Sequence, residues 1–341
     1  MTNSFASSVS ERFRWYQWAG LRRINDFDPE GNLLIISSPR GGSSWITDLI
    51  STLPKTVVLW EPLHLDASSA FRELNFCWQQ YIPEDANWDE AKQAIERVLR
   101  GKMVNTWTCM RGSRHRFLTA DKMVVKLCHA VALLPWLTRE FNFRFAPIYL
   151  VRHPFAVVAS QMQWHAWDYE FTGFDIPACP YNEIYRDHAA FLTSLKTKAE
   201  ALVASWCIAN LVPLSSARND ASWITVYYER LLMDPWHEIS RIFGRWGLPI
   251  PTHISDRIRK PSQTTNEATF VKGVERQLAK WKSYFSEDDV KRMMAVLDYF
   301  SLNHYGRDVY PLTELATAPG ATIRTGRQPE RIFSGLSTIG K

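Results

Sequence analysis

The segment Ser-Pro-Arg-Gly-Gly-Ser-Ser-Trp at residues 38–45 has the composition of an anion-binding turn. It follows the apolar run 33–36, which predicts a buried strand, and it leads into a helical pattern with one apolar face. A strand that turns through glycines into a helix directs free backbone N–H groups outward, and phosphate is the usual occupant of such a site. We therefore expect a phosphate group to bind at this turn.

The cation of this turn stands in an unusual place. In the common nucleotide-binding loop, Gly-x-x-x-x-Gly-Lys-Ser/Thr, a lysine and a metal-binding hydroxyl follow the glycines. Here Arg40 precedes Gly41 and Gly42, and no Lys-Ser/Thr pair follows them. The pattern predicts a phosphate site that works without the usual metal-binding device.

Other reactive side chains stand where further strands are expected to end. Glu61 directly follows the apolar run 57–60, and Arg152 directly follows the run 147–151, with Ser160 eight residues later. In a parallel sheet covered by helices, ligands bind beyond the carboxyl ends of the strands. We expect the loops after the first, second and fourth strands to converge on one site.

The elements that position these residues alternate along the chain. Short β-branched runs, including 123–127 and 223–227, alternate with helical patterns, which predicts an α/β fold with a mostly parallel sheet flanked by helices. Helices are expected at 87–100 with Asn87 as N-cap, at 182–212, from Pro235 to about Gly247, and from Ser286 to about Phe300. We expect one domain over residues 1–310 and a loosely held tail over 311–341.

Composition narrows the classes of protein. The 341 residues are 46% hydrophobic and 22% charged, as in an ordinary globular protein. The net charge of +5 suits an anionic ligand and is too weak and dispersed for a nucleic-acid partner. The five cysteines show no C-x-x-C pairing, which predicts reduced thiols and a cytoplasmic location. No signal peptide and no run near the ~20 apolar residues of a membrane span is found. The sequence does not specify the oligomeric state.

The segments around Arg40 and Arg152 resemble those of the sulfotransferases that use 3′-phosphoadenosine 5′-phosphosulfate (PAPS). Tyr228-Glu229 is similar to a later family segment near the adenine, and Lys272-Gly273 to a loop over the 3′-phosphate. The resemblance implies a P-loop-type three-layer sandwich, PAPS as donor with adenosine 3′,5′-bisphosphate as product, and no metal. It implies that Arg152 and Ser160 clamp the 3′-phosphate. It also implies a cradle for the 5′-phosphosulfate made of Arg40, Gly41, Gly42, Ser43, Ser44 and Trp45.

Three positions depart from the family pattern. Arg40 stands where the cytosolic phenol and steroid enzymes have Lys, although carbohydrate and tyrosyl-protein sulfotransferases carry Arg there. His153 replaces a common Asp, and Arg230 replaces the Asp of a Tyr-Glu-Asp segment. None of the three changes removes a group that sulfuryl transfer needs.

The acceptor hydroxyl needs a general base, for which two residues compete. Glu61 lies in a Glu-Pro-Leu stretch similar to that of sugar 6-O-sulfotransferases, in which a Glu is the expected base. His129 lies near the Lys-Thr-His segment of cytosolic sulfotransferases, but alignment on Lys126 puts Cys128 at the place of the base. A one-residue displacement turns a side chain to the other side of an extended strand. We therefore rank Glu61 first, with Lys126 reaching the sulfonate.

The expected acceptor-binding residues are mostly aromatic. His64 follows Glu61 by three residues and could orient the base or the acceptor. Trp164, His165 and Trp167 belong to an aromatic loop that could form a lid over a sugar ring or a flat ligand, or a small aromatic core.

The sequence leaves three functions in competition. The first is PAPS-dependent O-sulfation of a carbohydrate or small-metabolite hydroxyl. The second is a kinase that uses ATP and Mg²⁺, which is weakened by the missing Lys-Ser/Thr pair. The third is a non-catalytic nucleotide-binding module, which would not need both Arg40 and Glu61.

Overall fold

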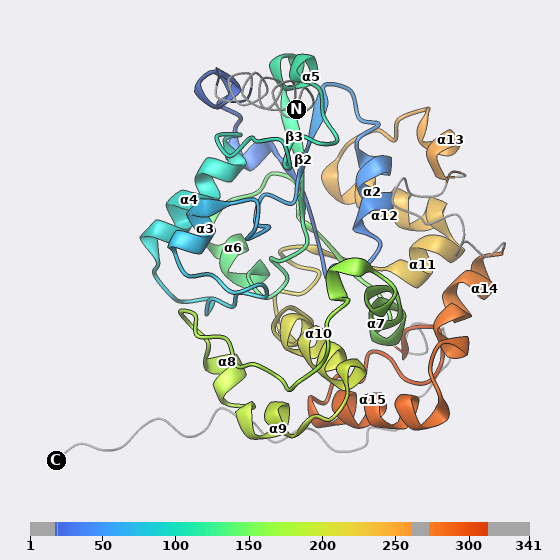
Figure 1. The fold of residues 1–341 in the computed structure, drawn as a ribbon. Helices are drawn as coiled ribbons and strands as arrows, with labels where there is room; N and C mark the ends of the chain where they lie inside the picture. The colour runs from blue at the N-terminus through green and yellow to red at the C-terminus, as the bar shows by residue number, and fades with distance from the viewer. Residues whose placement is uncertain (1–17, 19, 259, 261–272, 313–341) are drawn as a thin grey trace, which may run out of the picture.

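The structure is a computed structural model that describes residues 18, 20–258, 260 and 273–312. Within these residues, one sheet of parallel strands has the order β2-β3-β1-β4-β5 (Figure 1). The strands are β1 (Leu33–Ser37), β2 (Thr56–Trp60), β3 (Lys122–Leu127), β4 (Ile148–Val151) and β5 (Ile224–Tyr227). The expected α/β class is confirmed. Every expected strand is present, and in each of them one of the two boundaries is moved by one residue.

Helices connect the strands and cover both faces of the sheet. They are η1 (Pro29–Gly31), α2 (Ser43–Ile50), α3 (Ser69–Glu73), α4 (Asp89–Leu99), α5 (Arg114–Thr119), α6 (Leu134–Glu140), α7 (Pro154–Met162), η2 (His165–Trp167), α8 (Glu183–Arg186), α9 (Ala189–Ser194), α10 (Lys198–Ser215), α11 (Tyr228–Met233), α12 (Pro235–Trp246), α13 (Ile254–Ile258), α14 (Val274–Ala279), η4 (Lys280–Ser283) and α15 (Glu287–Tyr299). None of the described helices combines the length and apolar character that a membrane span requires.

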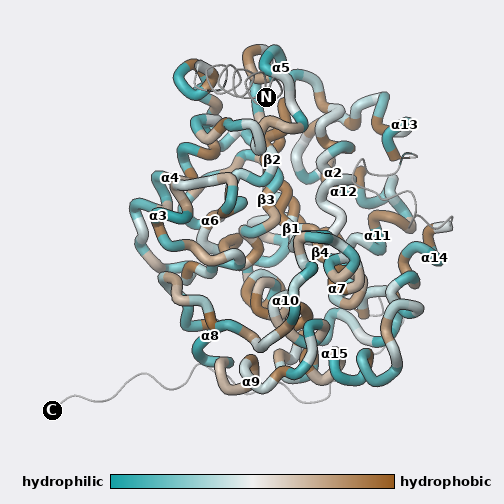
Figure 2. The backbone as a smooth tube through the Cα atoms, viewed as in Figure 1, coloured by the Kyte–Doolittle hydropathy of each residue, from teal (hydrophilic) through white to brown (hydrophobic). Residues whose placement is uncertain are grey.

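Each face of the sheet has its own apolar core. Successive side chains of a strand point to opposite faces, so Leu33 and Ile35 of β1 join a core with α2 and α12, while Leu34 and Ile36 join a core with α4, α6, α7, α10 and α15. Figure 1 shows α2 and α12 on one side of the sheet and α4 and α6 on the other. Because both faces are covered, the strands are mostly apolar, and Figure 2 shows hydrophobic residues concentrated in the strands and in α10.

Two helix expectations are wrong in detail. The fully described segment expected as one helix over 182–212 forms α8, α9 and α10. The interruption before α10 has a clear cause, because Thr197 and Glu200 form a reciprocal capping box that starts a new helix. Helix α4 has Trp88 rather than Asn87 at its N-cap, with no side-chain capping bond. The apolar pattern did not predict where α8, α9 and α10 begin and end, nor which of two adjacent residues is the N-cap of α4.

The later helices begin and end as expected. Ser286 and Asp289 form the capping box of α15, and the side chain of Asp234 accepts a hydrogen bond from the backbone of His237 at the start of α12. Gly247 ends α12 with a φ of 64°, in the left-handed region that favours glycine. The expected tail from residue 313 onward lies outside the described residues.

The strand order gathers the loops that carry the reactive residues. β1 lies at the centre, with β3 and β2 on one side and β4 and β5 on the other. The chain runs from β1 outward to β2, returns through β3 beside β1, and then crosses to β4 on the other side of β1. This reversal is the switch point beside which ligands bind in open α/β sheets.

Candidate active site

The turn between β1 and α2 depends on two glycines. A Cβ on Gly41 would lie 2.2 Å from Ser37 Oγ, and a Cβ on Gly42 would lie 2.4 Å from the ring of Tyr228. Gly42 also has a φ of 94°, which side chains rarely tolerate. Helix α2 then begins at Ser43 without a side-chain cap. The backbone N–H groups at this end are therefore suited to an anionic ligand.

Arg40 is fixed by contacts on several sides. Its Nε donates a hydrogen bond to Ser160 Oγ at 3.1 Å, and its carbonyl oxygen accepts one from Arg152 Nη1 at 2.9 Å. Its guanidinium carbon lies 4.4 Å from the ring centre of Trp164. Burial, and then the positive charge of Arg152, lower the pKa of Arg40. Two guanidinium groups held this close favour an anion between or beside them.

Arg152 lies between the turn and Tyr228. Its guanidinium carbon is 4.7 Å from the Tyr228 ring centre, and its Nε is buried without a hydrogen-bond partner. Burial raises the pKa of the Tyr228 phenol, which therefore stays neutral. Lys280 lines the same cleft, and burial together with the charge of Arg152 lowers its pKa. A buried donor without a partner beside further cations is what an anion-binding site shows when no anion is present.

The end of β2 holds an ion pair. The Glu61 carboxylate pairs with the ammonium of Lys126, and the Glu61 N–H donates to the Lys126 carbonyl oxygen at 2.9 Å. The Lys126 ammonium also lies 3.7 Å from the ring centre of Trp60. Burial would raise the pKa of Glu61, but the charge and hydrogen bond of Lys126 outweigh it and hold that pKa below its usual value. Glu61 is therefore an ionised carboxylate at neutral pH.

Glu61 has a strained backbone. Its φ of 42° lies in the left-handed region, and it precedes Pro62. Such a conformation in a residue other than glycine costs of order 1–3 kcal/mol and tends to be kept at functional sites. In this backbone conformation, the Glu61 carboxylate at the end of β2 pairs with Lys126 of the neighbouring strand β3.

Cys128 and His129 lie in the bend that follows β3, and they contact different groups. Cys128 Sγ lies 3.5 Å from Ser43 Oγ in the phosphate turn. The His129 ring instead lies 5.8 Å from the ring of His64, centre to centre. Burial lowers the pKa of His129 to about 4, so this imidazole is neutral at pH 7.

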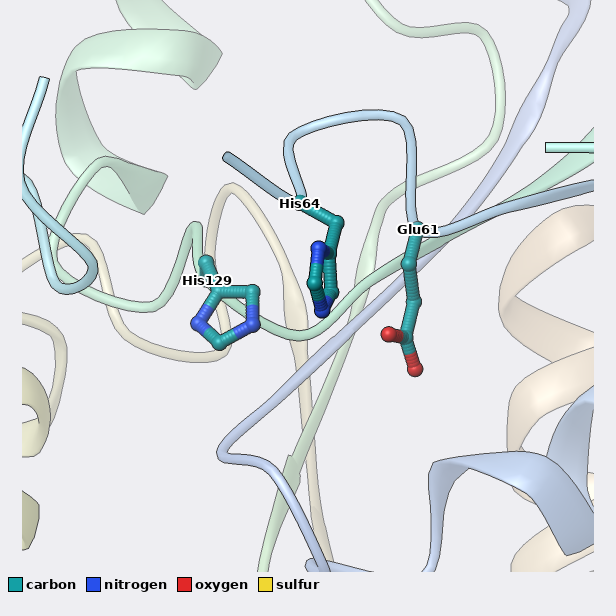
Figure 3. Close-up of side chains that lie close together, drawn as sticks. All are labelled: Glu61, His64 and His129. Carbon is teal, nitrogen blue, oxygen red and sulfur yellow. The ribbon is translucent and has the colours of Figure 1, made fainter. Parts of the chain in front are cut away.

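Figure 3 shows Glu61, His64 and His129 together, with His64 between the other two. One ligand atom from each lies within 4.8 Å of the others, a spacing that could hold a metal ion. Lys126 already neutralises the Glu61 carboxylate, however, and a cation bound there would meet the repulsion of that ammonium. The expectation of a site without metal stays a prediction.

A cleft of about 1110 Å³ joins most of these groups. Its wall contains many of the residues that the sequence singled out: Arg40, Gly42, Ser43, Ser44, Trp45, Glu61, His64, Lys126, His129, Arg152, Ser160, Trp164, His165, Trp167 and Tyr228. Gly41 lies behind this wall, against Ser37. Gly273 caps α14 and is not part of the wall, and Lys272 lies outside the described residues.

Sequence analysis missed one side of this cleft. Gln277 of α14, with Lys280 and Trp281 of η4, completes the wall near Arg152. These residues are more than 120 positions from Arg152 in the chain, and only tertiary packing brings them there. The run Lys-Trp-Lys at 280–282 was the one available signal, and it does not indicate which cation faces the cleft.

Residues 30–299 match the family model described as a sulfotransferase domain, a range that includes the whole sheet and every wall residue of the cleft. No curated protein matches the sequence.

Several solved structures are similar at low sequence identity. A sulfotransferase domain from the Synechococcus PCC 7002 olefin synthase is 16% identical, with a TM-score of 0.45 over 81% of this chain and 96% of that one. A sulfotransferase domain from the curacin biosynthetic pathway is 17% identical, with a TM-score of 0.43 over 80% and 97%. A mouse sulfotransferase complexed with PAP is 12% identical, with a TM-score of 0.40 over 85% and 90%.

Proposed function

The chain belongs to the sulfotransferase family, and we propose that it moves the sulfuryl group of PAPS to a hydroxyl of a carbohydrate or small metabolite. The observation that carries this proposal is the pair of cations at Arg40 and Arg152, joined through the Arg40 carbonyl oxygen. The pair lies beside a glycine turn that lacks the Lys-Ser/Thr pair by which the common nucleotide-binding loop holds phosphate and metal.

The residues of the cleft suit a donor with two separated anionic ends. Arg40 and the N–H groups at the start of α2 would hold the 5′-phosphosulfate. Arg152, with its unpartnered Nε, would bind the 3′-phosphate. The Ser160 hydroxyl accepts a hydrogen bond from Arg40, so its own proton is available to a phosphate oxygen. Tyr228 offers a ring face beside Arg152 for the adenine.

Catalysis would then rest on position and charge. In transfers of this kind the transition state is loose and in line, so stabilisation of the departing oxygen matters most. Arg40 neutralises the charge that develops on the phosphate oxygen as its bond to sulfur breaks. Glu61 accepts the proton of the acceptor hydroxyl as the new bond from oxygen to sulfur forms, and Lys126 keeps that carboxylate ionised beforehand.

His129 ranks second as the base, because its place in the sequence is displaced by one residue from that of the family's histidine. Burial lowers its pKa to about 4, and Lys126 likewise holds the pKa of Glu61 below its usual value, so proton affinity does not separate the two candidates. Its neighbour His64 lies between it and Glu61 (Figure 3), and we assign both imidazoles to the acceptor side of the cleft.

Ligand binding and transfer together test the proposal. Adenosine 3′,5′-bisphosphate should raise the melting temperature without added metal, whereas ATP with Mg²⁺ should raise it little. Radiolabelled sulfate should then pass from PAPS to members of an acceptor panel. Stabilisation by ATP with Mg²⁺ alone would overturn the proposal in favour of a kinase, and bisphosphate binding without transfer to any acceptor would favour a non-catalytic module.

A further inference from the structure

A smaller cavity of about 440 Å³ adjoins the cleft. The two share a wall that includes His64, Asp66, His129 and Trp167. The rest of the smaller cavity's wall comes from Ser38 before the glycines, Gln161 of α7, residues 78–79, Tyr169 and the residues of α10 from Leu202 to Ala209 that face it. We call it the side cavity. None of the donor-binding residues proposed above lies in its wall, so it is available for a second ligand.

The charge of the side cavity is opposite to that of the cleft. Among the described residues that line it, Asp66 is a carboxylate, and no lysine or arginine is present. The wall of the cleft shares Asp66 and also contains Glu61, but it adds the cations Arg40, Arg111, Lys126, Arg152 and Lys280. An anionic ligand therefore gains nothing from the side cavity and is repelled by Asp66, whereas an uncharged ligand is admitted.

Aromatic rings make up much of the wall. Trp78, Trp167, Tyr169 and Trp206 line the side cavity, and the side chains of Trp78 and Tyr169 are 42% and 50% exposed. The Trp78 ring packs against the rings of His64 and His129, and the Lys198 ammonium lies 4.2 Å from the Tyr169 ring centre. The aromatic faces of the wall suit the C–H face of a saturated ring as well as a flat aromatic ligand.

Polar atoms distinguish between these two kinds of ring. Gln79 Oε1, His64 Nδ1 and His129 Nδ1 are buried without a hydrogen-bond partner, and all three residues line the side cavity. Buried polar groups are normally satisfied, so an unsatisfied cluster in a cavity wall indicates a polar ligand. A ring with several hydroxyl groups can supply donors to such atoms, while a phenol has one hydroxyl, which the transfer itself uses.

The side cavity also has the right position. His64 and His129 belong to both walls, and each has a ligand atom within 4.8 Å of a carboxylate oxygen of Glu61. A ring held against Trp78 and Gln79 therefore has its near edge at the boundary where the proposed base lies. We propose that the side cavity is the acceptor site and that it selects an uncharged, polyhydroxylated ring, a neutral sugar, over phenols and over acidic sugars. This inference rests on the proposed sulfotransfer.

A matched acceptor panel tests the selection. A neutral methyl hexoside, the corresponding methyl hexuronide and p-nitrophenol are compared as acceptors at saturating PAPS. Binding of the same three compounds is followed by saturation-transfer NMR in the presence of adenosine 3′,5′-bisphosphate. The neutral hexoside should give the highest kcat/KM and the strongest transfer signal. A preference for the phenol or for the hexuronide, by either measurement, would overturn the inference.

Variants place the ligand in the side cavity. Trp78→Ala and Gln79→Met should each raise KM for the hexoside about tenfold, with kcat changed less than about twofold and bisphosphate affinity unchanged. Trp236→Ala is the matched control, because Trp236 is also exposed, at 48%, but lies on α12, outside the wall. An unchanged KM in both cavity variants would contradict the assignment.

A charge reversal gives a gain of function. Asp66→Lys should shift the ratio of kcat/KM values toward the hexuronide by about tenfold or more, and an unchanged ratio would count against the charge argument. The outcomes also separate this inference from the proposed function. Sulfation of the phenol alone would defeat the inference and leave sulfotransfer standing. If the bisphosphate does not bind, sulfotransfer fails, and the NMR signals of the free protein still decide which ring the side cavity takes.

Discussion

The carboxylate of Glu61 is ion-paired with the ammonium of Lys126 at the carboxyl ends of two neighbouring strands, where Trp60 of β2 and Lys126 of β3 are in register. The side chains are only 14% and 3% exposed. Besides any contact with the sulfonate, Lys126 keeps the partly buried Glu61 carboxylate ionised beside the Trp60 ring. Removing one member leaves the other as a buried charge without compensation.

Substitution of Glu61 tests its role as base. We expect Glu61→Gln to lower kcat by about 10²- to 10⁴-fold, the usual contribution of general-base catalysis, while adenosine 3′,5′-bisphosphate binds as before. Gln is preferred to Ala because it keeps a hydrogen-bond acceptor for Lys126. Steady-state sulfation rates and calorimetric binding provide the two measurements.

His129→Gln is the matched variant for the rival base. Because His129 lines the side cavity proposed to hold the acceptor, we expect its loss to act mainly on KM for the acceptor. If His129→Gln lost activity while Glu61→Gln stayed active, His129 rather than Glu61 would be assigned as the general base.

Arg152 should govern affinity for the nucleotide. A hydrogen bond from a charged donor to a phosphate contributes about 1.5–3 kcal/mol, so Arg152→Ala should raise the Kd for adenosine 3′,5′-bisphosphate by about 10- to 100-fold. Ser160→Ala removes one neutral hydroxyl and should have a smaller effect. Isothermal titration calorimetry without metal measures both. Arg144→Ala, which removes an exposed arginine paired with Asp28, is the control and should bind normally. Equal Kd values for all four proteins would exclude Arg152 from the phosphate site.

The glycine turn predicts a contrast between two Gly→Ala substitutions. Gly42→Ala forces a Cβ to within 2.4 Å of the Tyr228 ring at a φ of 94°, so we expect nucleotide binding to be lost or strongly weakened. Gly244→Ala, within α12, meets nothing within 4 Å and should stabilise the protein by about 0.5–1 kcal/mol, because alanine is the better helix former. Melting temperatures with and without bisphosphate measure both. Normal binding by Gly42→Ala would show that the turn does not need its close contact with Tyr228.

Much of this site was predictable because its signals are local. The apolar runs before Arg40, Glu61 and Arg152 indicate strands that end where the reactive side chains begin, and parallel order then brings these ends together. The resemblance of four short segments predicted the family, and the match of residues 30–299 to the family model confirms it.

Other features depend on packing between distant segments. The hydrogen bond that the Ser160 hydroxyl accepts from Arg40, 120 residues away, was not predicted. The side cavity is lined by Trp78, Tyr169 and Trp206, which have no common motif. The interruption before α10, by contrast, depends on a local signal, because Thr197 and Glu200 are three residues apart and their capping box outweighs a continuous apolar pattern. A single sequence does not show which of such contacts form.

His153 stands in place of the family's common Asp. The residue is 1% exposed, and burial lowers the pKa of its imidazole to about 3. Nδ1 accepts a hydrogen bond from the Phe155 N–H at 3.2 Å at the start of α7, and Nε2 lies 3.1 Å from the Gly306 carbonyl oxygen, to which it donates. The folded protein therefore holds a neutral ring, because a proton added at Nδ1 would face another donor.

Linkage turns this burial into a pH dependence. The unfolded chain binds a proton at His153 below its ordinary pKa of 6.5, whereas the folded chain does so only near pH 3. Stability from this group is therefore present above pH 6.5 and is lost as the pH falls toward 3, by about 3 kcal/mol between pH 7 and pH 4. His153→Asn keeps a side-chain acceptor at the N-cap and removes the titration. Between pH 7 and pH 4, the variant should therefore lose about 3 kcal/mol less of its unfolding free energy than the wild-type protein loses. Urea unfolding at pH 7, 5.5 and 4 measures both proteins, and the buried His129, which is common to the two, cancels in the difference. Parallel losses of stability in the two proteins would show that His153 is charged in the folded state or that it titrates without cost.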